Sequence, residues 1–139
     1  MDSADAPRIL ALGAEDRAWL RARVAAAVHA GLLTDAEALI TEFDARREEW
    51  AARHQHERGD PHALTVIYAV AFGQHLAWEF SLEWCIIEHP AGESLGLYGE
   101  ESEIVLLPLE TLTRRWHDPA QRSLGDLFAQ TRQNLRAGE

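Results

Sequence analysis

The amino-acid sequence predicts an α+β fold: a central buried helix with a small antiparallel β-meander and flanking amphipathic helices. Asp60 to Glu88 runs for about six helical turns with almost no charge, then changes to a short β-branched pattern. A helix that is apolar on most of its faces must be buried on most of them. Short apolar runs punctuated by Gly and Pro follow, which is typical of a meander.

The length and composition predict a single domain over residues 1–139, with a loosely ordered N-terminal segment over residues 1–14. The apolar fraction of 47% and the charged fraction of 26% are those of an ordinary globular chain. No apolar run approaches the ~20 residues that a membrane-spanning helix needs, so no membrane partner is expected.

Two amphipathic helices are predicted before the central one. The first covers residues 16–30, where apolar residues recur at three- and four-residue spacing, and Gly31 is a natural left-handed stop. Thr34 and Glu37 form a capping-box pattern that opens a second helix. The apolar stripe of this second helix is narrow, so we expect it to lie at the surface.

The central helix begins with Asp60 as its N-cap and Pro61 at its first position. Gly73 lies inside this helix, where it costs about 1 kcal/mol relative to Ala. The sequence therefore predicts that another element packs closely against the bare backbone at Gly73.

The remaining elements are short. Strands are predicted over residues 84–89, 95–98 and 103–107, and Pro108 ends the third of them. A short helix over residues 109–116 follows. Ser123 with Asp126 marks the start of a last helix that continues through Leu135.

The net charge of −10 argues against a nucleic-acid partner, because neutralising phosphates requires clustered basic residues. All thirteen basic residues are Arg, which together with the many Ala and Leu residues predicts a bacterial source. The lone Cys85 and an acidic start without signal-peptide features predict a cytoplasmic location.

The end of the chain is locally basic. We expect these five Arg side chains to pair with acidic neighbours in the same molecule, and an anionic partner is the alternative. They are Arg114, Arg115, Arg122, Arg132 and Arg136.

Candidate chemical groups are few. His54, His56 and His62 lie within nine residues and are weak metal candidates, but an i, i+2 spacing puts two of them on different helix faces. A polar loop is the favoured interpretation. His75 and Glu79 could hydrogen-bond on one face of the central helix as an acid/base pair, but a structural His at the helix margin is the favoured interpretation.

The run from Gly92 to Gly96 matches the G-x-S-x-G pattern around Ser94. That pattern needs a strand-to-helix turn, and here it lies in a predicted hairpin, so we do not expect a nucleophile. No phosphate-cradling loop and no cofactor motif occurs, so no cofactor is expected.

Five Trp residues are spread along the chain. Trp50 and Trp116 are flanked by charged residues and His, so these two are predicted to be partly exposed. Because aromatic residues dominate binding hot spots, they are the predicted partner-binding residues.

One set of marks runs from the central helix to the last helix: Ala71 to Leu76, Trp84, Leu106 to Pro108, Arg114-Arg115 and Leu124-x-x-Leu127-Phe128. In these marks the chain resembles an uncharacterised bacterial family, domain of unknown function 3806. The resemblance covers roughly residues 63–135. These are structural marks, and the resemblance implies a fold but no established activity.

Two functional hypotheses remain open. The first is a non-enzymatic module that binds another protein, as an adaptor or immunity-like protein, or that forms a homodimer. The second is a small enzyme that uses metal at the His54, His56 and His62 cluster or acid/base chemistry at His75 and Glu79.

Overall fold

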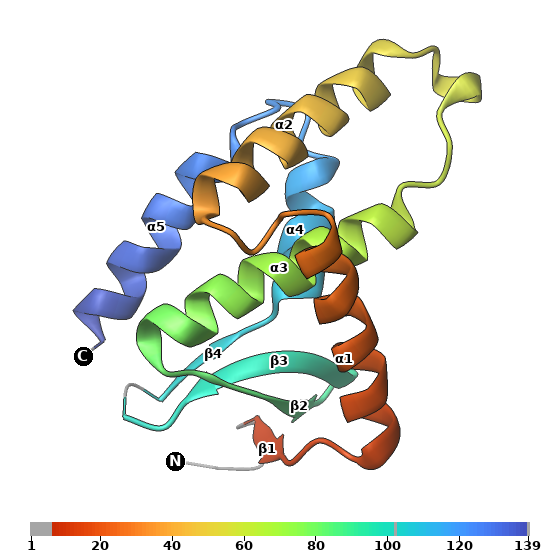
Figure 1. The fold of residues 1–139 in the computed structure, drawn as a ribbon. Coiled ribbons are helices and arrows are strands. Elements are labelled where there is room, and N and C mark those ends of the chain that lie inside the picture. The colour runs from red at the N-terminus through yellow and green to blue at the C-terminus, as the bar shows by residue number, and fades with distance from the viewer. Residues whose placement is uncertain (1–6, 102, 139) are drawn as a thin grey trace.

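The α+β prediction is confirmed by the computed structural model, which describes residues 7–101 and 103–138. A four-stranded antiparallel sheet lies on one side and the helices lie above and beside it (Figure 1). In chain order the described elements are β1 (Arg8–Leu10), α1 (Ala14–His29), α2 (Ala36–Ala52), a 3-10 turn (Gln55–Glu57), α3 (His62–Phe80), β2 (Glu83–His89), β3 (Gly92–Gly99), β4 (Ile104–Leu106), α4 (Pro108–Trp116) and α5 (Leu124–Ala137).

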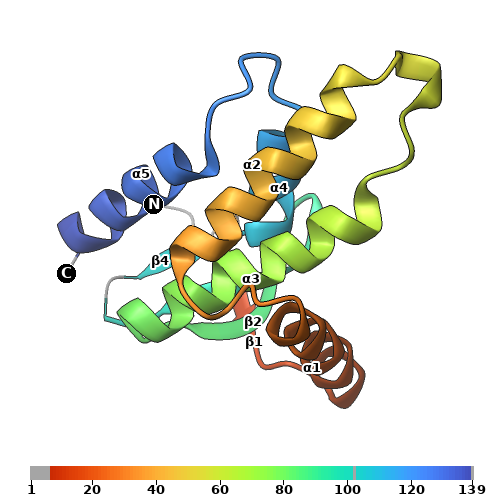
Figure 2. The same cartoon turned by 45° about the horizontal axis from the view of Figure 1, so that its top comes forward.

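Helix α3 is the axis of the fold, as its uncharged sequence predicts. It contacts α1, α2, α4 and β3, and α2 runs beside it at a shallow angle (Figure 2). Tyr68, Val70 and Leu76 on this helix are almost wholly buried. The face of α3 that carries Trp78 is not buried, because this side chain remains 61% exposed.

Gly73 makes the close contact that its position in a helix predicts. A Cβ placed there would lie 2.4 Å from Cη2 of Trp84 and 3.1 Å from Cγ of Pro108. The indole of Trp84 is held in place because its Nε1 donates a hydrogen bond to Oε1 of Gln74 at 3.0 Å. The missing side chain therefore lets the start of β2 and the start of α4 meet on α3.

Helix boundaries follow local capping. Helix α1 begins two residues earlier than predicted, because the Asp16 carboxylate accepts a hydrogen bond from the backbone N–H of Gly13. The predicted Thr34 cap of α2 is wrong by one residue: Asp35 is the N-cap, and its side chain accepts from the N–H of Ala38 at 2.8 Å. The left-handed stop at Gly31 is confirmed, with φ of 77°.

The sheet has the strand order β1-β2-β3-β4, with every neighbouring pair antiparallel. Its two edge strands have only three residues each. Strand β1 lies within the N-terminal segment for which the sequence predicts loose order, and residues 1–6 lie outside the described part. Arg8 pairs with Glu88 at 2.9 Å, which ties β1 to β2.

Helix α2 supplies polar anchors for the C-terminal part of the chain. Arg47 is only 5% exposed, and its guanidinium donates to the carbonyls of Arg115, Gln121 and Arg122 at 3.2, 2.6 and 2.7 Å. Asp44 accepts from the Ser123 hydroxyl at 2.6 Å and from the N–H of Leu124 at 2.9 Å. These bonds fix the loop between α4 and α5 and the start of α5.

Tyr68 gives the core a testable pH response. Burial, together with the hydrogen bond from its hydroxyl to Glu42 at 2.9 Å, raises the pKa of Tyr68 well above its ordinary value of 10.0. Because the folded pKa is raised, this stabilisation is present below about pH 10 and is lost as the pH rises above that value.

We expect the wild-type protein to lose stability above about pH 10 more steeply than Tyr68→Phe does, because the unfolded phenol ionises there. Urea denaturation at several alkaline pH values measures this. Identical pH profiles for the two proteins would contradict the assignment.

Candidate functional site

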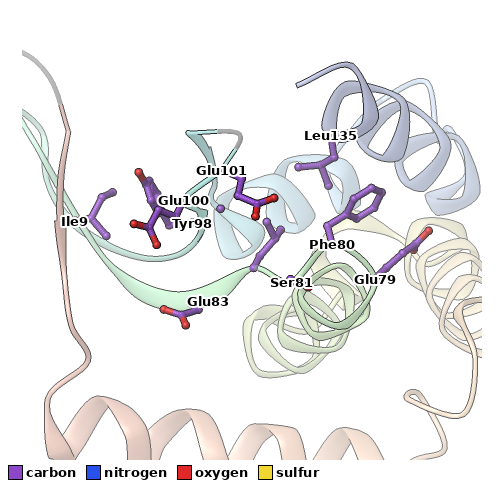
Figure 3. Close-up of a pocket in the computed structure, with 11 residues that line it drawn as sticks. Ile9, Glu79, Phe80, Ser81, Glu83, Tyr98, Glu100, Glu101 and Leu135 are labelled. Carbon is purple, nitrogen blue, oxygen red and sulfur yellow. The ribbon is translucent and has the colours of Figure 1, made fainter. Parts of the chain in front are cut away.

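The candidate site is an acidic pocket of about 660 Å³ where the sheet meets the ends of α3 and α5 (Figure 3). The pairing register puts Glu83, Tyr98 and Ile9 on one face of the sheet, because Glu83 pairs with Tyr98 and Ile9 pairs with Ile87. The lining residues are Ile9, Glu79, Phe80, Ser81, Leu82, Glu83, Tyr98, Gly99, Glu100, Glu101 and Leu135.

The end of α3 shapes one wall of this pocket. Ser81 takes a left-handed conformation with φ of 55°, and the N–H groups of Ser81 and Leu82 both bond to the carbonyl of Ala77. This cap turns the chain sharply into β2, so that Phe80 and Glu83 border the same space. The last turn of α3 carries no basic residue. The partial negative charge at the end of a long helix is therefore left without a cation of its own.

The glutamates of the pocket fall into two kinds. Glu79 is paired with Arg132 at 3.0 Å and with Arg136 at 3.5 Å, both on α5. No ion pair joins Glu83, Glu100 or Glu101 to a basic side chain within the part of the chain that the structure describes. Three carboxylates thus give the pocket an unbalanced negative charge.

The pocket is also lined by apolar side chains. Figure 3 shows Phe80 and Leu135 toward one end, Ile9 and Tyr98 toward the other, and the Glu101 carboxylate between them. Leu82 and Leu135 are buried in its floor, whereas Ile9 is 39% exposed. This lining favours a ligand that has a cationic group next to an apolar one. The carboxylates attract the positive charge, and the apolar floor buries the apolar group.

The histidines predicted as weak metal candidates are not brought together. The rings of His54 and His56 stack at 5.8 Å, but His62 begins α3 and lines a different pocket. Within residues 7–101 and 103–138, no group of three or more His, Cys, Asp or Glu residues could hold a metal ion.

His75 and Glu79 have separate partners in the structure. Nε2 of His75 bonds to the carbonyl of Leu32 at 2.9 Å, which joins α3 to the turn between α1 and α2. Glu79 turns instead to the arginines of α5. His75 therefore has a structural contact, and Glu79 belongs to the rim of the acidic pocket.

Ser94 lies inside strand β3, in agreement with the predicted hairpin. It is not at a strand-to-helix turn, which the G-x-S-x-G pattern needs for a nucleophile. Its hydroxyl is 3.1 Å from Nε2 of His89 across the hairpin, a contact that the sequence does not indicate. The two positions face each other diagonally on one face of the sheet.

The predicted exposure of the two tryptophans is wrong for Trp116. This residue is 2% exposed and packs edge-on against Phe43, with ring centroids 5.5 Å apart. Trp50 is partly buried against Trp116, and its Nε1 donates to the carbonyl of Gly59 at 2.8 Å. The exposed tryptophan is Trp78, for which the apolar sequence of α3 gives no signal.

These features define the class: an α+β protein whose described residues hold an acidic, partly apolar pocket at the joint of sheet and helices. The chain belongs to the family called domain of unknown function (DUF3806), whose model matches residues 46–129, more than half of its length. This confirms the family to which the sequence showed a resemblance. Neither a curated protein nor a solved structure matches the chain.

The matched region runs from the middle of α2 into α5 and includes all four pocket glutamates. Ile9 and Leu135, which complete the apolar lining, lie outside it. In the part of the chain that the structure describes, no helix has the length and apolar character needed to cross a membrane.

Proposed function

We propose that the protein is a non-enzymatic binding module of the bacterial cytoplasm, whose acidic pocket takes a basic segment of another protein. The observation that carries this proposal is the pocket itself, in which Glu83, Glu100 and Glu101, without an ion pair among the described residues, surround an apolar floor. The segment has Arg or Lys side chains next to an apolar side chain. The adaptor or immunity-like role predicted from the sequence remains compatible with this proposal.

Charge complementarity selects this occupant over an acidic or neutral one. The negative end of α3, whose last turn carries no basic residue, and the three carboxylates all favour positive charge in the same small volume. An acidic segment would meet like charges, which costs affinity and excludes it as a partner. The apolar floor adds the buried area that a purely electrostatic contact lacks.

A fluorescein-labelled peptide of three Arg-Leu-Arg-Ser repeats tests the proposal by fluorescence polarisation. We expect saturable binding that weakens as salt is added, because the charges at the pocket mouth are screened. The triple variant Glu83→Gln, Glu100→Gln and Glu101→Gln is expected to weaken binding by about a hundredfold, which is roughly fivefold for each charge removed.

The matched control removes three exposed carboxylates elsewhere, by Glu37→Gln, Glu48→Gln and Glu57→Gln. We expect this variant to bind the peptide as the wild type does, apart from a small effect of net charge. Ile9→Ser is expected to weaken binding by a few fold through the loss of apolar contact. Equal losses in the two triple variants would show that the peptide responds only to net charge, and the proposal would then be wrong.

A further inference from the structure

A second pocket, of about 930 Å³, lies along α4 and the loop that follows it and has the opposite charge. Arg114, Arg115 and Arg122 line it, and so does His62 at the start of α3. The lining acids are Glu110 and Asp118. Basic residues therefore outnumber acidic ones here, in a chain whose net charge is −10.

Asp118 organises the arginines but does not neutralise them. Its carboxylate accepts from Nε of Arg122 at 3.0 Å and from the N–H of Ala120 at 2.9 Å, and it lies 3.9 Å from Nη1 of Arg115. The bonds from Ala120 and Arg122 hold the pKa of Asp118 below its ordinary value, so the carboxylate stays ionised. One negative charge is thus shared between two guanidinium groups.

Arg115 is short of acceptors. Its Nη1 atom is buried and has no hydrogen-bond partner among the described residues. Buried polar groups nearly always have a hydrogen-bond partner, so this guanidinium nitrogen, which has only the Asp118 ion pair at 3.9 Å, indicates a place for one more acceptor. Arg114 is exposed on the same turn of α4 and enters no ion pair within residues 7–101 and 103–138.

The loop that carries this arrangement is rigidly held. The buried guanidinium of Arg47 binds the carbonyls of Arg115, Gln121 and Arg122, as described above. Gln121 lies in the left-handed region with φ of 50°, a conformation that costs free energy in a residue other than Gly. The bonds from Arg47 hold this loop in place. They therefore fix the backbone positions of Arg115 and Arg122, two of the arginines that line the pocket.

We propose that this pocket binds a phosphate group carried by a small organic molecule. Guanidinium groups match the oxygens of a phosphate in shape and charge, and several of them around one group give strong, directional hydrogen bonds. Leu109, Pro119 and Leu127 line the same pocket and supply an apolar wall for the organic part. The ligand class is therefore a phosphate monoester.

Isothermal titration calorimetry at low salt tests this with two probes, inorganic phosphate and phenyl phosphate. We expect both to bind, and phenyl phosphate to bind at least about tenfold more tightly because its ring covers the apolar wall. Equal affinities for the two probes would show that the apolar wall does not contribute to binding. The site would then be one for free phosphate, and the assignment of a phosphate monoester would be wrong.

Arg114→Gln with Arg122→Gln is expected to weaken phenyl phosphate binding by at least about tenfold. Both side chains are exposed, so circular dichroism should show that the variant stays folded. The control removes the same charge from exposed Arg21 and Arg53 by Arg21→Gln and Arg53→Gln, and should bind as the wild type does. No saturable binding to the wild type, or equal losses in the two double variants, would overturn the proposal.

Discussion

Replacing Arg47 with Met should lower the free energy of unfolding by about 3 kcal/mol. Arg47 is buried, and its guanidinium donates to three backbone carbonyls of the loop between α4 and α5. Met keeps the unbranched apolar stem but leaves those carbonyls without a donor. Urea denaturation followed by circular dichroism measures the loss.

Arg46→Met is the matched control, one residue away on the same helix. Its guanidinium is half exposed and pairs with Glu42 and Glu49 at the surface. Exposed ion pairs contribute little, so this variant should be much less destabilised than Arg47→Met. Similar losses of unfolding free energy in the two variants would contradict this prediction. They would show that the loss of any Arg from α2 is destabilising and that the three buried hydrogen bonds of Arg47 add nothing to stability.

Replacing Gly73 with Ala should lower the free energy of unfolding by about 2 kcal/mol, although Ala is the better helix former by about 1 kcal/mol. The new methyl group would lie 2.4 Å from the Trp84 ring, so the ring or the helix must move. The Trp84 ring cannot swing away freely, because it is bonded to Gln74. The same denaturation measurement reports the change.

Two further variants separate this clash from a general effect of the substitution. Gly59→Ala places its methyl group where nothing lies within 4 Å, so it should not destabilise the protein in this way. Combining Gly73→Ala with Trp84→Leu should cost less than the sum of the two single changes, because the smaller side chain makes room. Strict additivity would contradict the proposed contact.

The sequence predicts the parts of the fold that local patterns determine. The uncharged run of α3, the Gly73 contact, the Ser123 cap and the hairpin after Trp84 are all found where their patterns indicate. Each depends on the spacing of residues within a short segment or on a single residue type, such as Gly in a helix or Ser at a helix start, that has a specific structural role. Strand β1 lacks such a pattern, because its three residues become a strand only by pairing with β2.

The parts that the sequence could not predict depend on which surfaces meet. Arg47 stands among charged neighbours that indicate an exposed face, yet the loop after α4 covers it. Trp116 is flanked by Arg and His but faces the core from α4, whereas Trp78 lies on the one face of α3 that stays open. Both candidate pockets combine residues from separate elements, so no single stretch of sequence reveals them.

From the bonds that join α2 to the start of α5 we also expect an order of folding. Asp44 and Arg47 reach partners about seventy to eighty residues away in the chain, whereas β2 and β3 pair across a tight turn. Short loops close with less loss of entropy than long ones. The hairpin should therefore form early, and α5 should dock late, when α2 is already in place to cap it. In a refolding experiment with hydrogen-exchange labelling, amides of β2 and β3 should gain protection before those of α5.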